Sequence, residues 1–275
     1  MDLDAGRGRS WTSAIAVVAA VLCVGVAVAL GVSAQAVGGE RPLAERLSAR
    51  TEVDAVPAAS SAPEAAPPAA DGAAGVPASS LSQQARTTIV RADPAWTART
   101  AADTGIPGRA LQAYASAALT LKVEQPDCGL GWNTLAGLGA IESAHGTHSG
   151  GHLDDAGYPQ PAIRGIPLDG TASAAISDTD GGAWDGDAVW DRAVGPLQFI
   201  PETWQRWGAD GNGDGVADPN QIDDAALAAG RYLCASGEMT SAPGWRRAVF
   251  SYNHLDTYVD DVAAAANAYA ARAAG

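Results

Sequence analysis

The chain has 275 residues, 47% of them hydrophobic, and a formal net charge of -14 at pH 7. This length suits one folded domain with accessory segments. Because so acidic a protein without a lysine- or arginine-rich run repels phosphate backbones, we expect no nucleic-acid partner.

Residues 1–36 are expected to be a signal peptide or a membrane anchor. Arg7 and Arg9 precede an uncharged apolar run at 14–34, which approaches the roughly 20 residues that a membrane-spanning helix needs. The small-x-small triplet at 34–36 favours cleavage after Ala36, but the sequence leaves both alternatives open. In either case the rest of the chain should lie outside the cytoplasm, secreted or held at the cell membrane.

Residues 37–80 are expected to form an extended linker. The stretch 53–80 is rich in Ala, Pro, Ser and Gly and lacks aromatic residues, so it cannot build a core. Residues 81–275 hold every aromatic residue except Trp11, and they are numerous enough to bury the core of a single domain.

Helical patterns dominate residues 81–275, and the domain should be mainly α. Apolar spacing and proline positions predict helices at 107–124, 132–144, 201–207, 222–234, 243–252 and 255–274. A loop rich in glycine and aspartate separates the second helix from the third, and so long a loop inside a domain is usually functional. We expect a short hairpin within it, around Pro161 to Asp169.

Glu142 is the first candidate for chemistry. Leu135, Leu138 and Glu142 recur at three- and four-residue steps and therefore share one helix face. Ionised glutamate is rarely buried without a partner, and no lysine or arginine lies within a helical turn of this one. Costly placements of this kind mark functional sites, although a glutamate at a helix end can also rim the core and reach water.

Three motifs carry a resemblance to a known family. AIESAHG at 140–146, AVGPLQFIPETW at 193–204 and AVFSYNH at 248–254 resemble bacterial lytic murein transglycosylases, and more narrowly the membrane-bound lytic transglycosylase B group. The resemblance extends roughly from Gly105 to Ala273. It implies a lysozyme-like, SLT-type single catalytic domain at 81–275, with the long loop and an EF-hand-like loop as its irregular parts.

The resemblance also implies roles for single residues. Glu142 would be the catalytic acid, and Ser143, Gln198, Tyr252 and Asn253 would line the substrate groove. The substrate would be peptidoglycan glycan strands, cut between N-acetylmuramic acid and N-acetylglucosamine with formation of a 1,6-anhydromuramic end.

The chemistry can be argued from Glu142 itself. Glycosidic cleavage needs a carboxyl that is still protonated near neutral pH, and both apolar surroundings and the negative end of a helix raise a carboxyl pKa. A transglycosylase needs no second carboxylate, because the muramyl 6-hydroxyl attacks its own sugar and one glutamate acts as acid and then as base.

Other functions remain open at this point. A lysozyme-type muramidase would require a second carboxylate. The long loop offers these candidates for it: Asp154, Asp155, Asp180, Asp185, Asp187 and Asp191. A non-catalytic wall-binding module and a calcium-dependent structural or interaction protein are further alternatives.

A calcium loop is the second predicted site. The stretch DGNGDGVADPNQ has the spacing of an EF-hand loop, with glycine at its sixth position. The predicted ligands, at loop positions 1, 3, 5, 7 and 9, are Asp210, Asn212, Asp214, Val216 through its carbonyl, and Asp218. Gln221 replaces the usual glutamate at position 12, which weakens binding unless Asp223 or Asp224 substitutes. The alternative is a polar turn without an ion.

The remaining expectations concern other metals, cofactors and cysteines. His145, His148 and His152 have a spacing that zinc could use, but no metalloprotease signature accompanies them. We expect structural Ca²⁺, no organic cofactor and a monomer. Cys128 and Cys234 should form a disulfide in an oxidising compartment, the alternative being two buried thiols.

Overall fold

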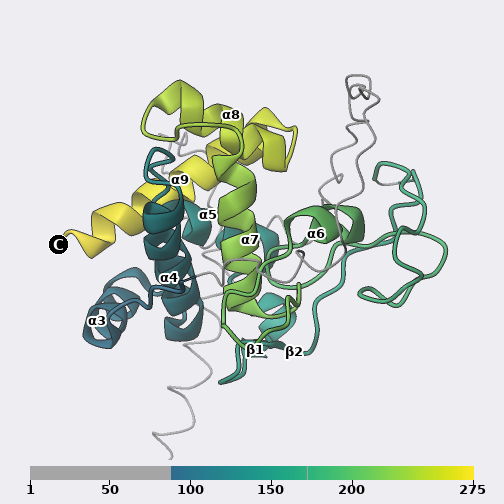
Figure 1. Ribbon diagram of the computed structural model, residues 1–275, viewed down its shortest axis with the longest axis horizontal. Helices are drawn as coiled ribbons and strands as arrows, with labels where there is room; N and C mark the ends of the chain where they lie inside the picture. Colours follow the sequence, from purple (N-terminus) through teal and green to yellow (C-terminus); the bar gives the residue numbers. More distant parts are fainter. Residues whose placement is uncertain (1–87, 172) are drawn as a thin grey trace, which may run out of the picture. The chain divides into compact units, whose positions relative to one another are not determined.

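The computed structural model describes residues 88–171 and 173–275, so the predicted signal or anchor and the linker lie outside the described residues (Figure 1). The described part is mainly helical, as predicted. Its α-helices are α3 (Pro94–Thr104), α4 (Gly108–Glu124), α5 (Trp132–Ser143), α6 (Pro201–Trp207), α7 (Ile222–Cys234), α8 (Ala242–Tyr252) and α9 (Asp256–Ala273). Within these described ranges, no helix combines the length and the apolar content needed to cross a membrane.

Helix α5 lies at the centre of the helical packing. It contacts α4, α7 and α9, and all its residues from Thr134 to Ala140 are buried. A helix that is apolar on every side belongs in a core. Gly137 permits the close approach of α9, because a Cβ added at this position would lie 2.9 Å from the Val262 carbonyl oxygen.

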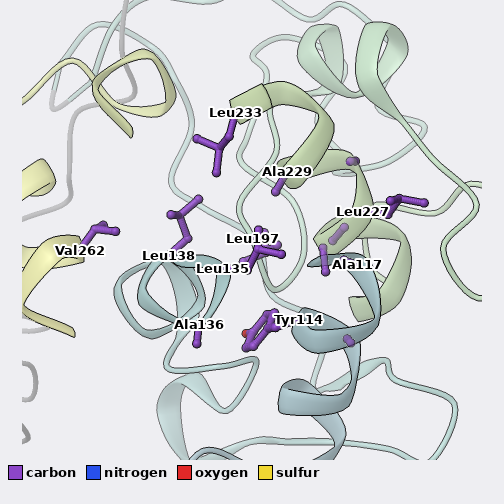
Figure 2. Packing of buried hydrophobic residues seen from close by; sticks show 14 of the residues in the cluster. Tyr114, Ala117, Leu135, Ala136, Leu138, Leu197, Leu227, Ala229, Leu233 and Val262 are labelled. Atoms are coloured by element: carbon purple, nitrogen blue, oxygen red, sulfur yellow. The ribbon is translucent and has the colours of Figure 1, made fainter. Parts of the chain in front are cut away.

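The core side chains pack around α5, and one of them, Leu197, comes from a loop. Figure 2 shows Tyr114 of α4, Leu135 and Leu138 of α5, and Leu197 from the loop before α6 packed together. Leu197 has no exposed surface. Burying this leucine therefore fixes the loop that carries the GPLQF motif against the core.

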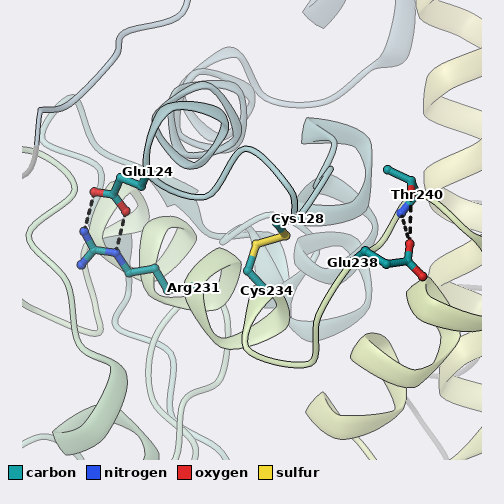
Figure 3. Close-up of a disulfide and its surroundings, with 6 residues drawn as sticks. All are labelled: Glu124, Cys128, Arg231, Cys234, Glu238 and Thr240. Carbon is teal, nitrogen blue, oxygen red and sulfur yellow. Dashed lines mark hydrogen bonds and ion pairs between the residues drawn. A yellow bond between two sulfur atoms is a disulfide. The ribbon is translucent and has the colours of Figure 1, made fainter.

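A disulfide joins the end of α7 to the turn after α4, which confirms the predicted Cys128–Cys234 pairing (Figure 3). The two cysteines are 106 positions apart in the sequence. Closing a loop of this length stabilises a fold by about 4 to 5 kcal/mol in the chain-entropy description. The same two helices are also linked by Arg231, whose guanidinium donates to both carboxylate oxygens of Glu124 at 2.8 and 3.1 Å.

Helix α3 was not predicted from the sequence, although its caps are typical. Asp93 accepts a hydrogen bond from the Trp96 amide at 2.7 Å, proline occupies the first turn, and Gly105 ends the helix with φ 77°. The buried positions of α3 are threonines, at 97, 100 and 104. A search for apolar periodicity therefore finds no helix there.

The hairpin of the long loop lies earlier than predicted. Strands β1 (His152–Leu153) and β2 (Pro159–Gln160) pair antiparallel, with His152 opposite Gln160. The turn between them is set by Asp154, whose side chain accepts from the Tyr158 amide at 2.9 Å, and by a glycine with φ 91°. Within 161–169 the structure has only isolated bridges to residues further along the loop.

Candidate active site

Glu142 occupies the last turn of α5, where the chain leaves the core. Three successive residues after the helix have left-handed backbone, Ala144 (φ 50°), His145 (φ 63°) and Gly146 (φ 80°). The His145 amide donates to the Gly139 carbonyl at 2.7 Å, which closes the helix end. The predicted helix is therefore correct to within one residue, and its end leaves the Glu142 side chain partly exposed.

The Glu142 carboxyl is held by a tyrosine from the C-terminal helix. Tyr258, in the first turn of α9, donates its hydroxyl to Glu142 Oε1 at 2.5 Å. Burial raises the pKa of Glu142 to about 7, and the hydrogen bond from Tyr258 opposes this rise with a smaller effect. A large fraction of Glu142 is therefore protonated at neutral pH.

The loop 195–199 is tied to the same region by two hydroxyl groups. Ser143 Oγ donates to the Pro196 carbonyl at 2.5 Å and accepts from the Gly146 amide at 2.8 Å. Tyr252, the last residue of α8, donates its hydroxyl to the Leu197 carbonyl at 2.8 Å. Ser143 is buried, so its hydroxyl is used inside the protein.

Gln198 and Asn253 supply two side-chain amides, the first from the loop 195–199 and the second from the position directly after Tyr252. Gln198 has φ 51°, is half-buried, and donates through Nε2 to the Gly195 carbonyl at 2.8 Å. Asn253 follows α8 and is buried. Within the described residues its Oδ1 atom has no hydrogen-bond partner. A buried acceptor without a partner costs about 1 to 3 kcal/mol, so it is an unusual feature for a purely structural residue.

Both tyrosines interact electrostatically with Glu142. The pKa values of Tyr252 and Tyr258 are raised well above 10, first by burial and then by the negative charge of Glu142. Both phenols therefore remain hydrogen-bond donors. The structure brings Glu142, Ser143 and Tyr252 close to the loop that carries Gln198. The roles of these residues toward a substrate stay predictions.

Tyr258 is the residue that sequence reasoning missed. The helical spacing of Tyr258, Val262 and Tyr269 predicts a buried face on the last helix, and all three are buried. A tyrosine on such a face is usually packing. Its contact with Glu142 depends on how α9 packs on α5, and the local sequence carries no signal for that.

No carboxylate of the described residues is among the causes of the Glu142 pKa shift. Burial raises this pKa, and the hydrogen bond from Tyr258 lowers it. Aspartates of the long loop have partners within that loop: Asp187 pairs with Arg192 at 2.9 Å, and Asp191 accepts from the Thr179 hydroxyl at 2.8 Å. This arrangement fits chemistry that uses a single carboxyl.

The predicted histidine spacing does not form a zinc site. His145 is buried between Tyr114 and Tyr269, with Nε2 at 2.9 Å from the Tyr269 hydroxyl, and burial lowers its pKa to about 4. His148 and His152 are exposed. Among residues 88–171 and 173–275, the side chains close enough to share a metal ion are Asp178, Asp180 and Asp191, and no histidine is among them.

The predicted calcium loop has the backbone arrangement of a tight acidic turn. Asp210 accepts from the amides of Gly213 at 2.6 Å and Gly215 at 2.9 Å. Asp224, in the first turn of α7, accepts from the Gly211 amide at 2.7 Å and through its other oxygen from the Asp218 amide at 2.9 Å. The loop is therefore fastened to α7 through a carboxylate.

Gln221 takes a structural role at the twelfth loop position. It is fully buried, and its Oε1 accepts from the amides of Asp223 at 2.7 Å and Asp224 at 2.9 Å, which caps α7. Its Nε2 donates to the Ala156 carbonyl at 2.8 Å. Both ends of the amide are thus used inside the protein. Of the two suggested substitutes, Asp224 reaches the loop, and calcium binding stays a prediction.

A protein-family model matches the C-terminal part of the chain. Residues 177–273 match the family model described as "Transglycosylase SLT domain". The matched segment contains Gln198, Tyr252, Asn253 and Tyr258, whereas Glu142 and Ser143 precede it. Searches of curated proteins and of solved structures found no match to the chain. Together with the mainly helical fold, the match over 177–273 supports the SLT, lysozyme-like superfamily.

Proposed function

We propose that this protein is a peptidoglycan lytic transglycosylase. It cleaves the β-1,4 bond between N-acetylmuramic acid and N-acetylglucosamine and leaves a 1,6-anhydromuramic end, as the membrane-bound lytic transglycosylase B group does. The match to the transglycosylase SLT domain supports the substrate class and the type of reaction. The observation that carries the assignment of the catalyst is Glu142, a partly exposed carboxyl with a pKa of about 7.

The first step is protonation of the leaving group. Tyr258 donates to Oε1 of Glu142, which leaves Oε2 to hold the acidic proton. That proton passes to the glycosidic oxygen as its bond to the anomeric carbon breaks. General acids of this kind contribute about 10² to 10⁴ in rate when their pKa lies near the working pH.

The second step uses the same carboxyl as a base. Glu142 is now ionised and accepts the proton of the muramyl 6-hydroxyl while that oxygen bonds to the anomeric carbon of its own sugar. The proton balance closes because the residue regains the proton that it gave away, and no water is consumed. Attack within one sugar unit is favoured entropically over attack by a second molecule.

The neighbouring polar groups position the sugar. Gln198 and Asn253 offer neutral amides, which suit acetamido groups and hydroxyls. Tyr252 and Ser143 hold the loop 195–199 in place through the carbonyls of Leu197 and Pro196. In this proposal the two hydroxyl residues act chiefly by fixing the groove wall.

The proposal includes a place and a cofactor for the enzyme. The predicted signal or anchor at 1–36 supports an extracytoplasmic enzyme, secreted or attached to the cell membrane, that acts as a monomer on the wall. Ca²⁺ at Asp210, Asn212, Asp214, Val216 and Asp218 would fasten the connection between α6 and α7, and no organic cofactor takes part.

Digestion of purified peptidoglycan tests the proposal directly. The full chain should release fragments with anhydro ends, one water lighter than reducing ends by mass, and Glu142→Gln should release them at least about 100-fold more slowly. Glu124→Gln is the matched control, because it changes an exposed glutamate whose ion pair is worth less than about 1 kcal/mol. Fragments with reducing ends would instead identify a muramidase. Binding without any fragments would identify a wall-binding module.

A further inference from the structure

A cavity lies at the opposite end of α5 from Glu142. Its volume is about 640 Å³, and it lies between the start of α3, the outer side of α4 and the start of α5. Trp96, Leu119, Leu130 and Trp132 line it. Trp132 precedes Glu142 by ten positions on one helix, about 15 Å along the axis. The cavity is therefore separate from the candidate active site.

The wall of this cavity is mostly hydrocarbon. The indoles of Trp96 and Trp132 meet edge to face, with ring centroids 5.6 Å apart. Leu119, which lines the cavity, is 39% exposed, and Val123, four positions further along α4 and 65% exposed, extends the apolar surface beyond the lining. A cavity of this size that continues into exposed apolar residues is typical of a binding site.

Few polar groups face the cavity, and they restrict what can bind. Among the described residues that line it, Lys122 is the only cation. Asp93 already accepts from the Trp96 amide at 2.7 Å. A glycan needs many donors and acceptors, which this wall does not offer, and the net charge of -14 disfavours an anionic lipid surface. An apolar, extended peptide with an acidic group is the chemistry that fits.

The linker of this same chain has that chemistry. We propose that the segment Pro63–Pro68, PEAAPP, docks in the cavity. Proline-rich segments favour polyproline II and bind grooves lined by aromatic side chains, and here Pro67 and Pro68 would contact the two indoles. Glu64 complements Lys122 in charge.

The distance along the chain makes this docking favourable. The described domain begins at residue 88, and Ala92 at the cavity rim follows Pro68 by about 24 residues. A flexible chain of that length has a root-mean-square span of about 27 Å. A segment tethered in this way experiences an effective concentration in the millimolar range, so even a weak contact is populated. If the segment docks, only the part of the linker before residue 63 remains between the domain and residues 1–36.

Photo-crosslinking in the full chain tests this docking. Benzoylphenylalanine placed at Val123 should form an adduct with residues 60–71 of the same chain. The matched control is the same probe at Val189, which is 64% exposed but lies in the long loop, and it should not form this adduct. Peptide mapping by mass spectrometry identifies the partners, and the chain mass distinguishes a bond within one chain from a bond between two.

Substitutions on both sides of the contact make the test specific. Pro67→Ser with Pro68→Ser, and separately Leu119→Glu, should each lower the yield of the adduct at least fivefold. Ile166→Glu, at 41% exposure against 39% for Leu119, should leave it unchanged. Equal yields at positions 123 and 189, or adducts only with another chain or with added lipid vesicles or glycan, would overturn the proposal. None of these readouts depends on peptidoglycan cleavage.

Discussion

In two regions of this protein, the pKa values of carboxyl groups are shifted in opposite directions. Glu142, at the end of α5, has its pKa raised by burial to about 7. Asp178, in the long loop, has its pKa lowered, chiefly by hydrogen bonds from backbone amides, among them those of Asp180, Gly181 and Gly182. The same functional group is thus prepared to give a proton in one region and to stay ionised in the other.

The difference arises from where the hydrogen-bond donors come from. Loop aspartates receive donors from residues two to four positions ahead, so a short turn is enough to stabilise their charge. Glu142 lies where backbone donors are used up by the helix, and its donor, Tyr258, comes from another helix. Desolvation therefore decides its state.

Removing the acidic proton should have the largest effect. We expect Glu142→Gln to lower the rate of muropeptide release from purified peptidoglycan by about 10² to 10⁴, the range for loss of a general acid. Asp178→Asn should change the rate less than about twofold, because that group is held ionised and has no proton to give at neutral pH. A Glu142→Gln variant with more than a tenth of the original rate would show that the acid lies elsewhere.

Stability should respond to pH in opposite directions at the two positions. The pKa of Glu142 is raised from 4.5 to about 7, so its protonated form stabilises the fold below pH 4.5, and this contribution is lost as the pH rises through 7. We therefore compare the change that Glu142→Gln makes to the free energy of unfolding at two pH values. This change should be more favourable at pH 8 than at pH 4.5 by up to about 3 kcal/mol.

Asp178 provides the comparison for that measurement. Its pKa is lowered from 3.8, so it stabilises the fold above pH 3.8 and loses this contribution at lower pH. Asp178→Asn should thus lower stability at pH 7 and change little in strong acid. Urea unfolding of both variants over pH 3 to 8 measures the two trends, and parallel trends would refute the contrast between the sites.

Tyr258→Phe should have a smaller and more specific effect. Losing the donor to Oε1 removes an interaction worth about 1 kcal/mol, so kcat/KM should fall roughly fivefold. Because this hydrogen bond lowers the pKa of Glu142, its removal should also move the alkaline limb of the pH profile to higher pH. Tyr269→Phe is the control, because its hydroxyl contacts His145. A profile that stays in place in Tyr258→Phe would exclude a direct role.

The same contrast explains what the sequence could predict. The bounds of α7 at 222–234 and the Cys128–Cys234 bridge were predicted correctly, because caps, periodicity and cysteine number are local or compositional signals. The partner of Glu142 was not predicted, because it is 116 positions away and depends on the packing of α9. Helix α3 was missed because threonines form its buried face.

Calcium binding should have the smallest effect on stability, and it allows the two acidic loops to be compared. With Ca²⁺ at ten times its dissociation constant, the fold should gain about 1.4 kcal/mol, which raises Tm by about 3 to 5 °C for a domain of this size. Asp214→Asn should reduce the gain, because it removes one negative charge from the predicted ligand set while keeping an oxygen at that position. Differential scanning calorimetry with Ca²⁺ and with EDTA measures it.

The variant Asp178→Asn shows which of the two acidic loops is responsible for the calcium response. Asp178, Asp180 and Asp191 have ligand atoms within 4.8 Å of one another, whereas the carboxylates of the 210–218 loop form no such group within the described residues. If the 210–218 loop binds the ion, its carboxylates must move together on binding, and Asp178→Asn keeps the calcium response. If Asp178→Asn alone removes the response, the EF-hand-like spacing describes a turn whose carboxylates are already satisfied by their own backbone amides.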